Sequence, residues 1–233
     1  MISVCIATYN GEKYIYQQLK SILKQLREND EIIISDDSSN DRTLEIVRII
    51  DDKRIKLLEN NKFYSPIYNF ENALKKASGD TIFLSDQDDV WEDNKIAVML
   101  ALVSRYDVII SDCTVIDEND RVLYESFFKL MNSGKGLLKN FHKNTALGCC
   151  MVFNRRILKK ALPFPPNLPM HDWWIYMIGE LFGEVHFCEE KLIRYRRHAS
   201  NKTSTTDKSP YKLYKKLFFR INLFYNLIKR TLK

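Results

Sequence analysis

The stretch Thr81-Ile82-Phe83-Leu84-Ser85-Asp86-Gln87-Asp88-Asp89 places three carboxylates directly after a short apolar run. The run is brief, β-branched and aromatic, which predicts a buried strand. Acids at the carboxyl end of such a strand put negative charge where open α/β sheets bind ligands. Because like charges this close repel each other, they need a counter-charge, and a divalent cation is the usual one. The alternative is a solvated acidic turn that caps the next helix.

Strand and helix patterns alternate through the first half of the chain. Apolar runs predict strands at residues 2–7, 31–35, 55–58, 81–85 and 108–111. Helical periodicity predicts helices at residues 12–25, from 41 onward, 65–76 and 92–104. Strands separated by helices of about 10 to 15 residues indicate parallel βαβ units. The fold class we expect is α/β, with a doubly wound, mainly parallel central sheet flanked by helices.

The second half of the chain is less regular. Residues 146–153 predict a strand interrupted at Gly148-Cys149-Cys150. The Pro-rich residues 162–169 exclude a regular helix or a central strand. They lead to His171-Asp172-Trp173-Trp174, where we expect a helix that ends near residue 182, followed by two short strands up to Arg197.

Cysteine usage and charge narrow the class of protein. The five cysteines are odd in number and lack CxxC spacing, which predicts reduced core residues of a cytosolic protein and no structural zinc.

Residues 208–233 carry eight Lys or Arg and no acid, whereas the rest of the chain holds 28 basic and 30 acidic residues. The slightly acidic body argues against nucleic-acid binding. We expect no signal peptide and no membrane-spanning helix, since no stretch approaches about 18 apolar residues.

The C-terminal segment predicts an amphipathic helix. We divide the chain into a body, residues 1–205, and a basic amphipathic helical tail, residues 206–233. The apolar side chains that recur every three or four residues are Tyr214, Leu217, Phe218, Ile221, Phe224, Tyr225 and Ile228. A basic helix rich in aromatic residues fits an interfacial anchor on an anionic membrane. The alternative is a helix packed on the body with its lysines exposed.

Polar residues also follow the first two expected strands. Thr8-Tyr9-Asn10 ends the first strand, and Asp36-Asp37 ends the second. Because the carboxyl ends of parallel strands share one edge, these residues should line one crevice with the acids at 86–89. Turn or capping roles are the alternative for each group.

The motifs, in this order, resemble family 2 glycosyltransferases. The resemblance spans residues 1–201 and rests on Ile6 to Asn10, Ser35 to Asp41, Ser78 to Asp80, Asp86 to Trp91, Thr145 to Cys150, His171 to Trp174 and Tyr195 to His198. The combination of Asp-Gln-Asp-Asp with His-Asp-Trp-Trp is similar to bacterial rhamnosyltransferase-like members that build surface polysaccharides. It implies a GT-A fold, a nucleotide-diphosphate sugar donor, and Mg²⁺ or Mn²⁺ as cofactor.

The resemblance also implies a role for each matching residue. It assigns nucleotide-sugar binding to Thr8, Tyr9, Asn10, Asp36, Asp37, Asp86, Asp88, Arg196 and Arg197. It assigns the metal to Asp88, Asp89 and His198, and acceptor contacts to Gly148, His171, Trp173 and Trp174. Which of the three acids ligates the metal stays open. Packing roles are the alternative for Gly148 and His171, and a surface position is the alternative for His198.

Asp172 is the expected catalytic base. Inverting glycosyl transfer needs one carboxylate to take a proton from the acceptor hydroxyl. The neighbouring Trp173 and Trp174 would raise the pKa of Asp172 by desolvation. The alternative is a helix N-cap followed by two core tryptophans.

The predicted function is inverting, metal-dependent transfer of one sugar to a saccharide or lipid-linked saccharide acceptor in surface polysaccharide synthesis. We expect dTDP-rhamnose or a UDP-hexose as donor, and a cytoplasmic protein held peripherally on the inner face of the plasma membrane. Single transfer is favoured because the Gln-x-x-Arg-Trp motif of processive synthases is missing. The alternative is a catalytically silent nucleotide-sugar or glycan-binding module. A nucleotidyltransferase is disfavoured, because no Gly-rich phosphate loop with a basic residue follows the first strand.

Overall fold

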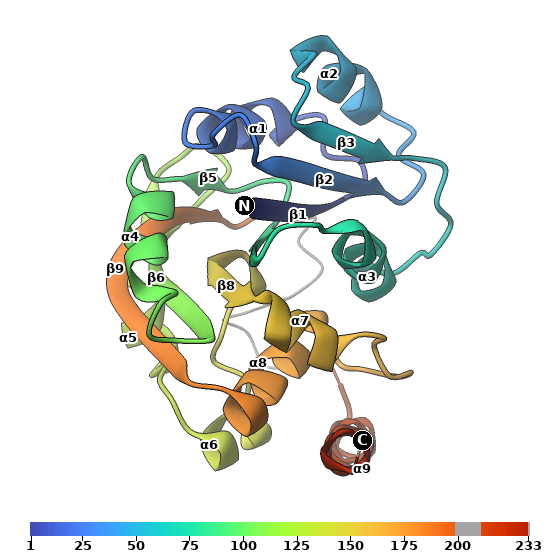
Figure 1. Cartoon of the computed structure of the whole chain (residues 1–233), viewed down its shortest axis with the longest axis vertical. Helices are drawn as coiled ribbons and strands as arrows, with labels where there is room; N and C mark the ends of the chain where they lie inside the picture. Colours follow the sequence, from blue (N-terminus) through green and yellow to red (C-terminus); the bar gives the residue numbers. More distant parts are fainter. Residues whose placement is uncertain (199–210, 233) are drawn as a thin grey trace.

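The computed structural model describes residues 1–198 and 211–232, which form one curled mixed sheet flanked by helices (Figure 1). The sheet order is β3-β2-β1-β4-β8-β6-β9-β5, and β7 pairs with β6. The strands are β1 (Ile2–Thr8), β2 (Glu31–Asp36), β3 (Ile55–Leu58), β4 (Thr81–Ser85), β5 (Val90–Trp91), β6 (Val108–Ile116), β7 (Val122–Tyr124), β8 (Met151–Asn154) and β9 (Val185–Arg196). The helices are α1 (Ile15–Leu23), α2 (Thr43–Ile50), α3 (Pro66–Lys76), α4 (Lys95–Leu102), α5 (Phe127–Met131), α6 (Leu137–His142), α7 (Arg155–Ala161), α8 (His171–Phe182) and α9 (Leu213–Thr231), with a 3₁₀ turn η1 (Gly148–Cys150).

The first four strands form the parallel half of the sheet, at the positions predicted from their apolar runs. β1 pairs in parallel with both β2 and β4, and β2 pairs in parallel with β3. The register sets Thr8 opposite Asp36 and Ile6 opposite Ser85, so the three polar strand ends meet at one edge. The β1–β4 pair is tight at its other end, because a Cβ on Gly79 would lie 2.7 Å from the backbone oxygen of Met1.

The second half makes the sheet mixed, where the sequence predicted a mainly parallel one. β8 runs antiparallel to both β4 and β6, whereas β9 runs parallel to β6. The strand expected at 146–153 is shorter, because the backbone turns through η1 before β8 begins. The two short strands expected before Arg197 form one long strand, β9. The α/β class is confirmed, and all five cysteines are buried and free of disulfides.

The C-terminal helix is present as α9, and it packs against α8 at the lower edge of the molecule in Figure 1. The boundary placed between residues 205 and 206 lies outside the described residues. Within residues 1–198 and 211–232, no helix has the length and apolarity needed to cross a bilayer.

Candidate active site

A cavity of about 660 Å³ opens at the carboxyl edge of β1 and β4. Its walls come from the loops after these strands, from α3 and the loop before it, from η1, from the start of α8 and from the segment after β9. The structure brings these predicted residues together in its lining: Thr8, Tyr9, Asn10, Asp37, Asp86, Asp88, Gly148, His171, Asp172 and His198.

The acids that end β2 hold loops in place. The buried Asp36 accepts a hydrogen bond from Thr8 Oγ1 at 2.9 Å and is not part of the cavity lining. Asp37 lines the cavity, and its two carboxylate oxygens accept hydrogen bonds from the backbone N–H groups of Phe63 at 2.6 Å and Ser65 at 3.0 Å. Asp37 therefore fixes the chain that leads into α3, while Asp36 supports the end of β1 from behind.

Gln87, a residue that the sequence analysis did not single out, joins the ends of β1 and β4. Its Oε1 accepts a hydrogen bond from Tyr9 N at 2.9 Å, and its Nε2 donates to Tyr9 O at 3.1 Å. Gly11 makes room for this amide, since a Cβ there would lie 2.5 Å from Gln87 Oε1. The position of this amide between Asp86 and Asp88 was the signal that could have identified its role.

Gly11→Ala is expected to displace the Gln87 amide and loosen the Tyr9 loop. We expect a loss of about 1–3 kcal/mol in the free energy of unfolding, because the added methyl group overpacks the contact and disturbs two hydrogen bonds. Urea unfolding of Gly11→Ala, Gln87→Ala and the double variant measures the coupling. An alanine at position 11 should cost less once Gln87 is shortened; equal costs in both backgrounds would show that the contact is unimportant.

Asp88 and His198 meet inside the cavity although they are far apart in sequence. Asp88 Oδ2 lies 2.7 Å from His198 Nε2, and both side chains line the cavity. The Tyr14 ring packs against the imidazole of His198 with 5.2 Å between centroids.

Burial and the charges of Asp88 and Asp172 raise the pKa of the neighbouring Asp86 to about 8. This crowding of carboxylates favours a bound cation.

Asp89 does not line the cavity. Its Oδ1 accepts a hydrogen bond from Arg196 N at 2.9 Å, and its buried Oδ2 has no hydrogen-bond partner among the described residues. Burial, with the charges of Asp88 and Asp86, raises the pKa of Asp89 well above its ordinary value. Asp89 thus tethers the loop of residues 86–89 to β9.

Two groups of side chains differ in how well they suit Mg²⁺ and Mn²⁺. Among the described residues, ligand atoms of Asp86, Asp89 and Cys149 lie within 4.8 Å of one another. The pKa of the Cys149 thiol is raised well above its ordinary value by hydrogen bonding to Cys150 and by burial, so it stays protonated and suits these cations poorly. Asp88 and His198 both line the cavity, and the carboxylate oxygens of Asp88 suit either cation.

Arg196 ends β9 and Arg197 follows it, and neither lines the cavity. Arg196 is buried, and its guanidinium donates to Asp88 O at 2.9 Å and pairs with Asp120 at 2.9 Å. Arg197 donates its backbone N–H to Ile116 O at 2.8 Å. In this structure Arg196 supports the backbone of Asp88, and its expected diphosphate contact stays a prediction. A basic residue that does line the cavity is Lys13.

Asp172 lies in the first turn of α8 and faces the cavity. Its Oδ2 accepts a hydrogen bond from Gly148 N at 3.2 Å, and its Oδ1 accepts one from Asn144 Nδ2 at 3.3 Å. The N-cap is Met170, so the capping alternative does not apply. Burial raises the pKa of Asp172 to about 6, although backbone N–H groups of Trp173 and Gly148 oppose the shift. The carboxylate is held in one orientation and is more basic than an ordinary Asp.

The tryptophans beside Asp172 donate hydrogen bonds to the ends of neighbouring helices. Trp174 is fully buried and donates its Nε1–H to Ala161 O at 2.9 Å. Trp173 donates its Nε1–H to Asn140 O at 2.7 Å. Neither lines the cavity, and their expected acceptor contacts stay predictions. These hydrogen bonds fix α8 against α6 and α7.

His171 combines burial with unused hydrogen-bonding groups. Its ring stacks on Phe70 at 4.0 Å, and neither ring nitrogen has a partner among the described residues. Burial lowers the pKa of His171 to about 3, so the ring stays neutral. No sequence motif marks the wall that Phe70 belongs to, since α3 reaches the cavity only through its packing on β1 and β2. The members of this wall are Tyr64, Ser65, Pro66, Asn69 and Phe70.

Comparison with known proteins places this geometry in a family. The sequence model of Glycosyl transferase family 2 matches residues 3–162. WfgD of Escherichia coli, a UDP-Glc:alpha-D-GlcNAc-diphosphoundecaprenol beta-1,3-glucosyltransferase, is 30% identical over 179 residues, which are 76% of this chain and 68% of WfgD. The dTDP-rhamnosyl transferase RfbG of Shigella flexneri is 29% identical over 238 residues, covering 94% of this chain and 80% of RfbG.

Solved structures share the fold. S. aureus TarS 1-349 in complex with UDP-GlcNAc superposes with a TM-score of 0.74 at 24% identity, over 97% of this chain and 66% of that one. The mannosyltransferase PcManGT from Pyrobaculum calidifontis, in complex with GDP-Man and Mn²⁺, gives a TM-score of 0.63 at 18% identity, over 98% and 64%. The chain thus spans about two thirds of the length of these two structures. The sheet is of the GT-A type, and the chain belongs to glycosyl transferase family 2.

Proposed function

We propose that the cavity transfers one sugar from a nucleotide-diphosphate sugar to an acceptor hydroxyl, with inversion at the anomeric carbon. The observation that carries this proposal is that one cavity holds both the Asp88–His198 pair and a carboxylate, Asp172, with a pKa of about 6. The test is an assay of nucleoside diphosphate released from donor plus acceptor, with and without Mn²⁺. Release that does not depend on the acceptor would contradict transfer.

The donor occupies the half of the cavity formed by the ends of β1, β2 and β4. Thr8, Tyr9, Asn10 and Asp37 would contact the nucleoside, and Asp86 would lie on the ribose side of the acids. Asp88 and His198 would hold Mg²⁺ or Mn²⁺, which supplies Lewis-acid stabilisation of the charge on the leaving diphosphate. The complexes of TarS with UDP-GlcNAc and of PcManGT with GDP-Man and Mn²⁺ support this arrangement.

The acceptor occupies the half formed by η1 and the start of α8. The Asp172 carboxylate takes the proton of the acceptor hydroxyl as that oxygen attacks the anomeric carbon, and the nucleoside diphosphate departs with the bonding electrons. Gly148 N–H and the Asn144 amide fix the carboxylate for this step. The neutral ring of His171, stacked on Phe70, is placed to contact acceptor hydroxyl groups.

The pH dependence of the reaction should report Asp172. A protonated carboxyl cannot accept the acceptor proton, so kcat/KM should fall about tenfold for each pH unit below about pH 6. Because the pKa of Asp172 is raised, this acid limb should lie about two units higher than for an ordinary Asp. Assays from pH 4.5 to 8 at saturating Mn²⁺ measure the limb. A rate that stays constant down to pH 4.5 would exclude Asp172 as the base.

The donor is dTDP-rhamnose or a UDP-hexose, and the acceptor is a saccharide, free or lipid-linked, in surface polysaccharide synthesis. The relatives RfbG and WfgD, by their names, use donors of these two kinds, and the acceptor of WfgD is carried on diphosphoundecaprenol. A lipid carrier places the reaction at the cytoplasmic face of the plasma membrane. Residues 1–205 carry the chemistry. A thermal-shift screen of nucleotide sugars with Mn²⁺ identifies the donor, because bound ligand raises Tm.

A further inference from the structure

Helix α9 is held to the body by polar contacts. Arg220 donates to His142 O at 2.6 Å, Asn222 donates to Pro166 O at 2.9 Å, and Arg230 donates to Leu162 O at 2.9 Å. Leu223 and Leu227 are the buried apolar residues of this helix. The helix therefore has a fixed position on the body, set by side chains from its basic face.

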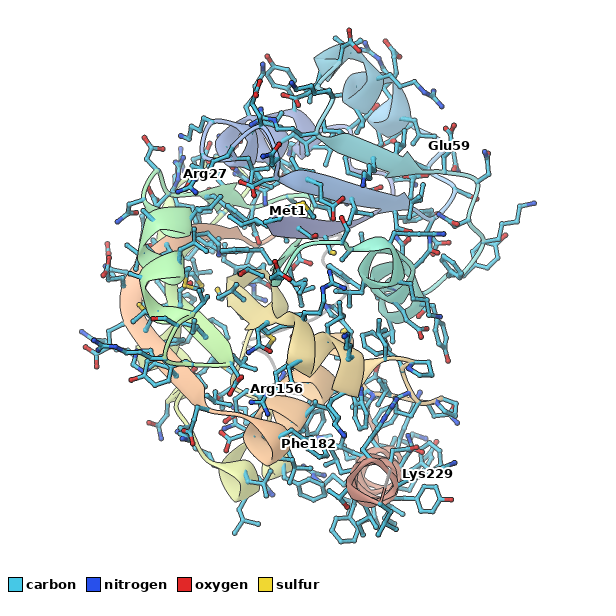
Figure 2. The ribbon with its side chains drawn as sticks, in the orientation of Figure 1. Met1, Arg27, Glu59, Arg156, Phe182 and Lys229 are labelled. Carbon is cyan, nitrogen blue, oxygen red and sulfur yellow. The ribbon has the colours of Figure 1, made fainter. Side chains whose placement is uncertain are left out.

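The apolar stripe of α9 faces solvent. Its side chains recur every three or four residues, so they share one side of the helix. They are 43% to 82% exposed, and Figure 2 shows ring side chains extending from α9 away from the rest of the molecule. The stripe consists of Tyr214, Leu217, Phe218, Ile221, Phe224, Tyr225, Ile228 and Leu232. A contiguous apolar surface of this kind marks an interaction site.

Helix α6 borders the stripe. The ring of Phe141 packs edge-on against Phe224 with 6.2 Å between centroids. On the same short helix, Leu138 is 83% exposed. Both helices lie along the lower edge of the molecule in Figure 1. The apolar surface thus spans two helices that contact each other.

The positive charge around the apolar stripe of α9 indicates which kind of partner binds there. Residues 211–232 contain no Asp or Glu, and their basic residues are Lys212, Lys215, Lys216, Arg220, Lys229 and Arg230. A second copy of this chain would bring two sets of positive charges together. An anionic bilayer offers an apolar layer for the stripe and negative headgroups for the lysines. We infer that α9, bordered by α6, lies in the interface of an anionic lipid bilayer.

This surface adjoins the acceptor half of the cavity. Asn144, which donates a hydrogen bond to Asp172, lies two residues after His142, whose carbonyl binds Arg220. Two residues span at most about 7 Å of chain. A docked protein therefore holds its base close to the membrane surface, as a lipid-linked acceptor requires. This second step rests on the proposed function, whereas the docking of α9 does not.

The test is co-sedimentation of the full chain with vesicles of phosphatidylglycerol and phosphatidylcholine, or of phosphatidylcholine alone. A stripe variant carries Phe218→Ser, Ile221→Ser and Tyr225→Ser; the matched control carries Tyr16→Ser, Ile49→Ser and Val122→Ser, which are similarly exposed elsewhere. The stripe variant should lose at least tenfold in partitioning to anionic vesicles, and the control should bind as the original chain does. Lys215→Gln and Lys229→Gln should each weaken binding about fivefold at low salt.

Two results would overturn the inference. Equal vesicle binding by the stripe variant and the original chain would exclude the stripe as the contact. A chain that ignores vesicles but changes from dimer to monomer in the stripe variant would show that a second copy covers this face. Turnover of a water-soluble acceptor separates the two proposals: it should be unchanged in the stripe variant. Vesicle binding without any turnover would refute the proposed function and leave the docking surface standing.

Discussion

Asp172→Asn is expected to lower kcat by about 10²–10⁴-fold while the affinity for the nucleotide sugar stays within about twofold. The amide has the shape of the carboxylate, and its oxygen can still accept the hydrogen bond from Gly148 N. It cannot take the proton of the acceptor hydroxyl. Product formation, measured chromatographically at saturating donor and acceptor, gives kcat. Calorimetric titration with donor and Mn²⁺ gives the affinity.

Two comparisons sharpen this experiment. Asn144→Ala removes one hydrogen bond from Asp172 and keeps the carboxylate, so it should cost far less activity than Asp172→Asn. Asp86 is the other carboxyl in the cavity whose pKa is raised, to about 8. If Asp172→Asn kept more than a tenth of the activity and Asp86→Asn abolished it, the proton would go to Asp86.

Asp88→Asn should raise the Mn²⁺ concentration needed for half-maximal activity by at least about 100-fold. The substitution removes the charge from the oxygen that lies beside His198, and hard divalent cations depend on carboxylate charge for affinity. Excess Mn²⁺ should restore part of the activity. Direct titration of Mn²⁺, followed by the electron paramagnetic resonance signal of the free ion, measures the same loss without an activity assay.

Asp89→Asn is the matched control for the metal experiment. Its amide oxygen can still accept the hydrogen bond from Arg196 N, and its side chain does not line the cavity. Mn²⁺ affinity should therefore change only a few-fold. The opposite pattern, with Asp89→Asn losing Mn²⁺ and Asp88→Asn keeping it, would move the metal to the side of Asp86 and Cys149.

The sequence predicted those parts of the site in which the functional residue lies next to a recognisable strand in the chain. Thr8, Asp37 and Asp88 each follow an apolar run, and parallel pairing of β1 with β2 and β4 brings the ends of those runs to one edge. The direction of β8 could not be inferred in the same way. It depends on the turn at η1 and on pairing with β4 and β6, which are distant in sequence.

Helix geometry divides the residues around Asp172 between the cavity and the core. Successive residues of an α-helix point about 100° apart, so His171 and Asp172 can face the cavity while Trp173 and Trp174 point elsewhere. Arg196 shows the related effect in a strand, where neighbouring side chains alternate between faces. A run of chemically suitable residues is therefore divided between the cavity and the core. Sequence order alone does not show which residue faces the cavity and which is buried in the core.

The C-terminal tail shows which structural features the sequence pattern can predict and which it cannot. Its amphipathic pattern correctly predicted a helix. The structure adds that polar side chains of this helix bind backbone carbonyl groups of the body. Arg220 and Arg230 bind backbone carbonyl groups of His142 and Leu162. Those carbonyls lie in loops and at helix ends, where sequence periodicity does not predict a hydrogen-bond acceptor. The exposure of the apolar stripe follows from these contacts.

The configuration of the new glycosidic bond tests the account most directly. The cavity offers one base, Asp172, on the acceptor side, so the acceptor oxygen displaces the nucleoside diphosphate in a single step. The one-bond carbon–hydrogen coupling at the anomeric position of the purified product, compared with that of the donor, reports the configuration. We predict inversion. A product with retained configuration would contradict the role of Asp172 and the single displacement built on it.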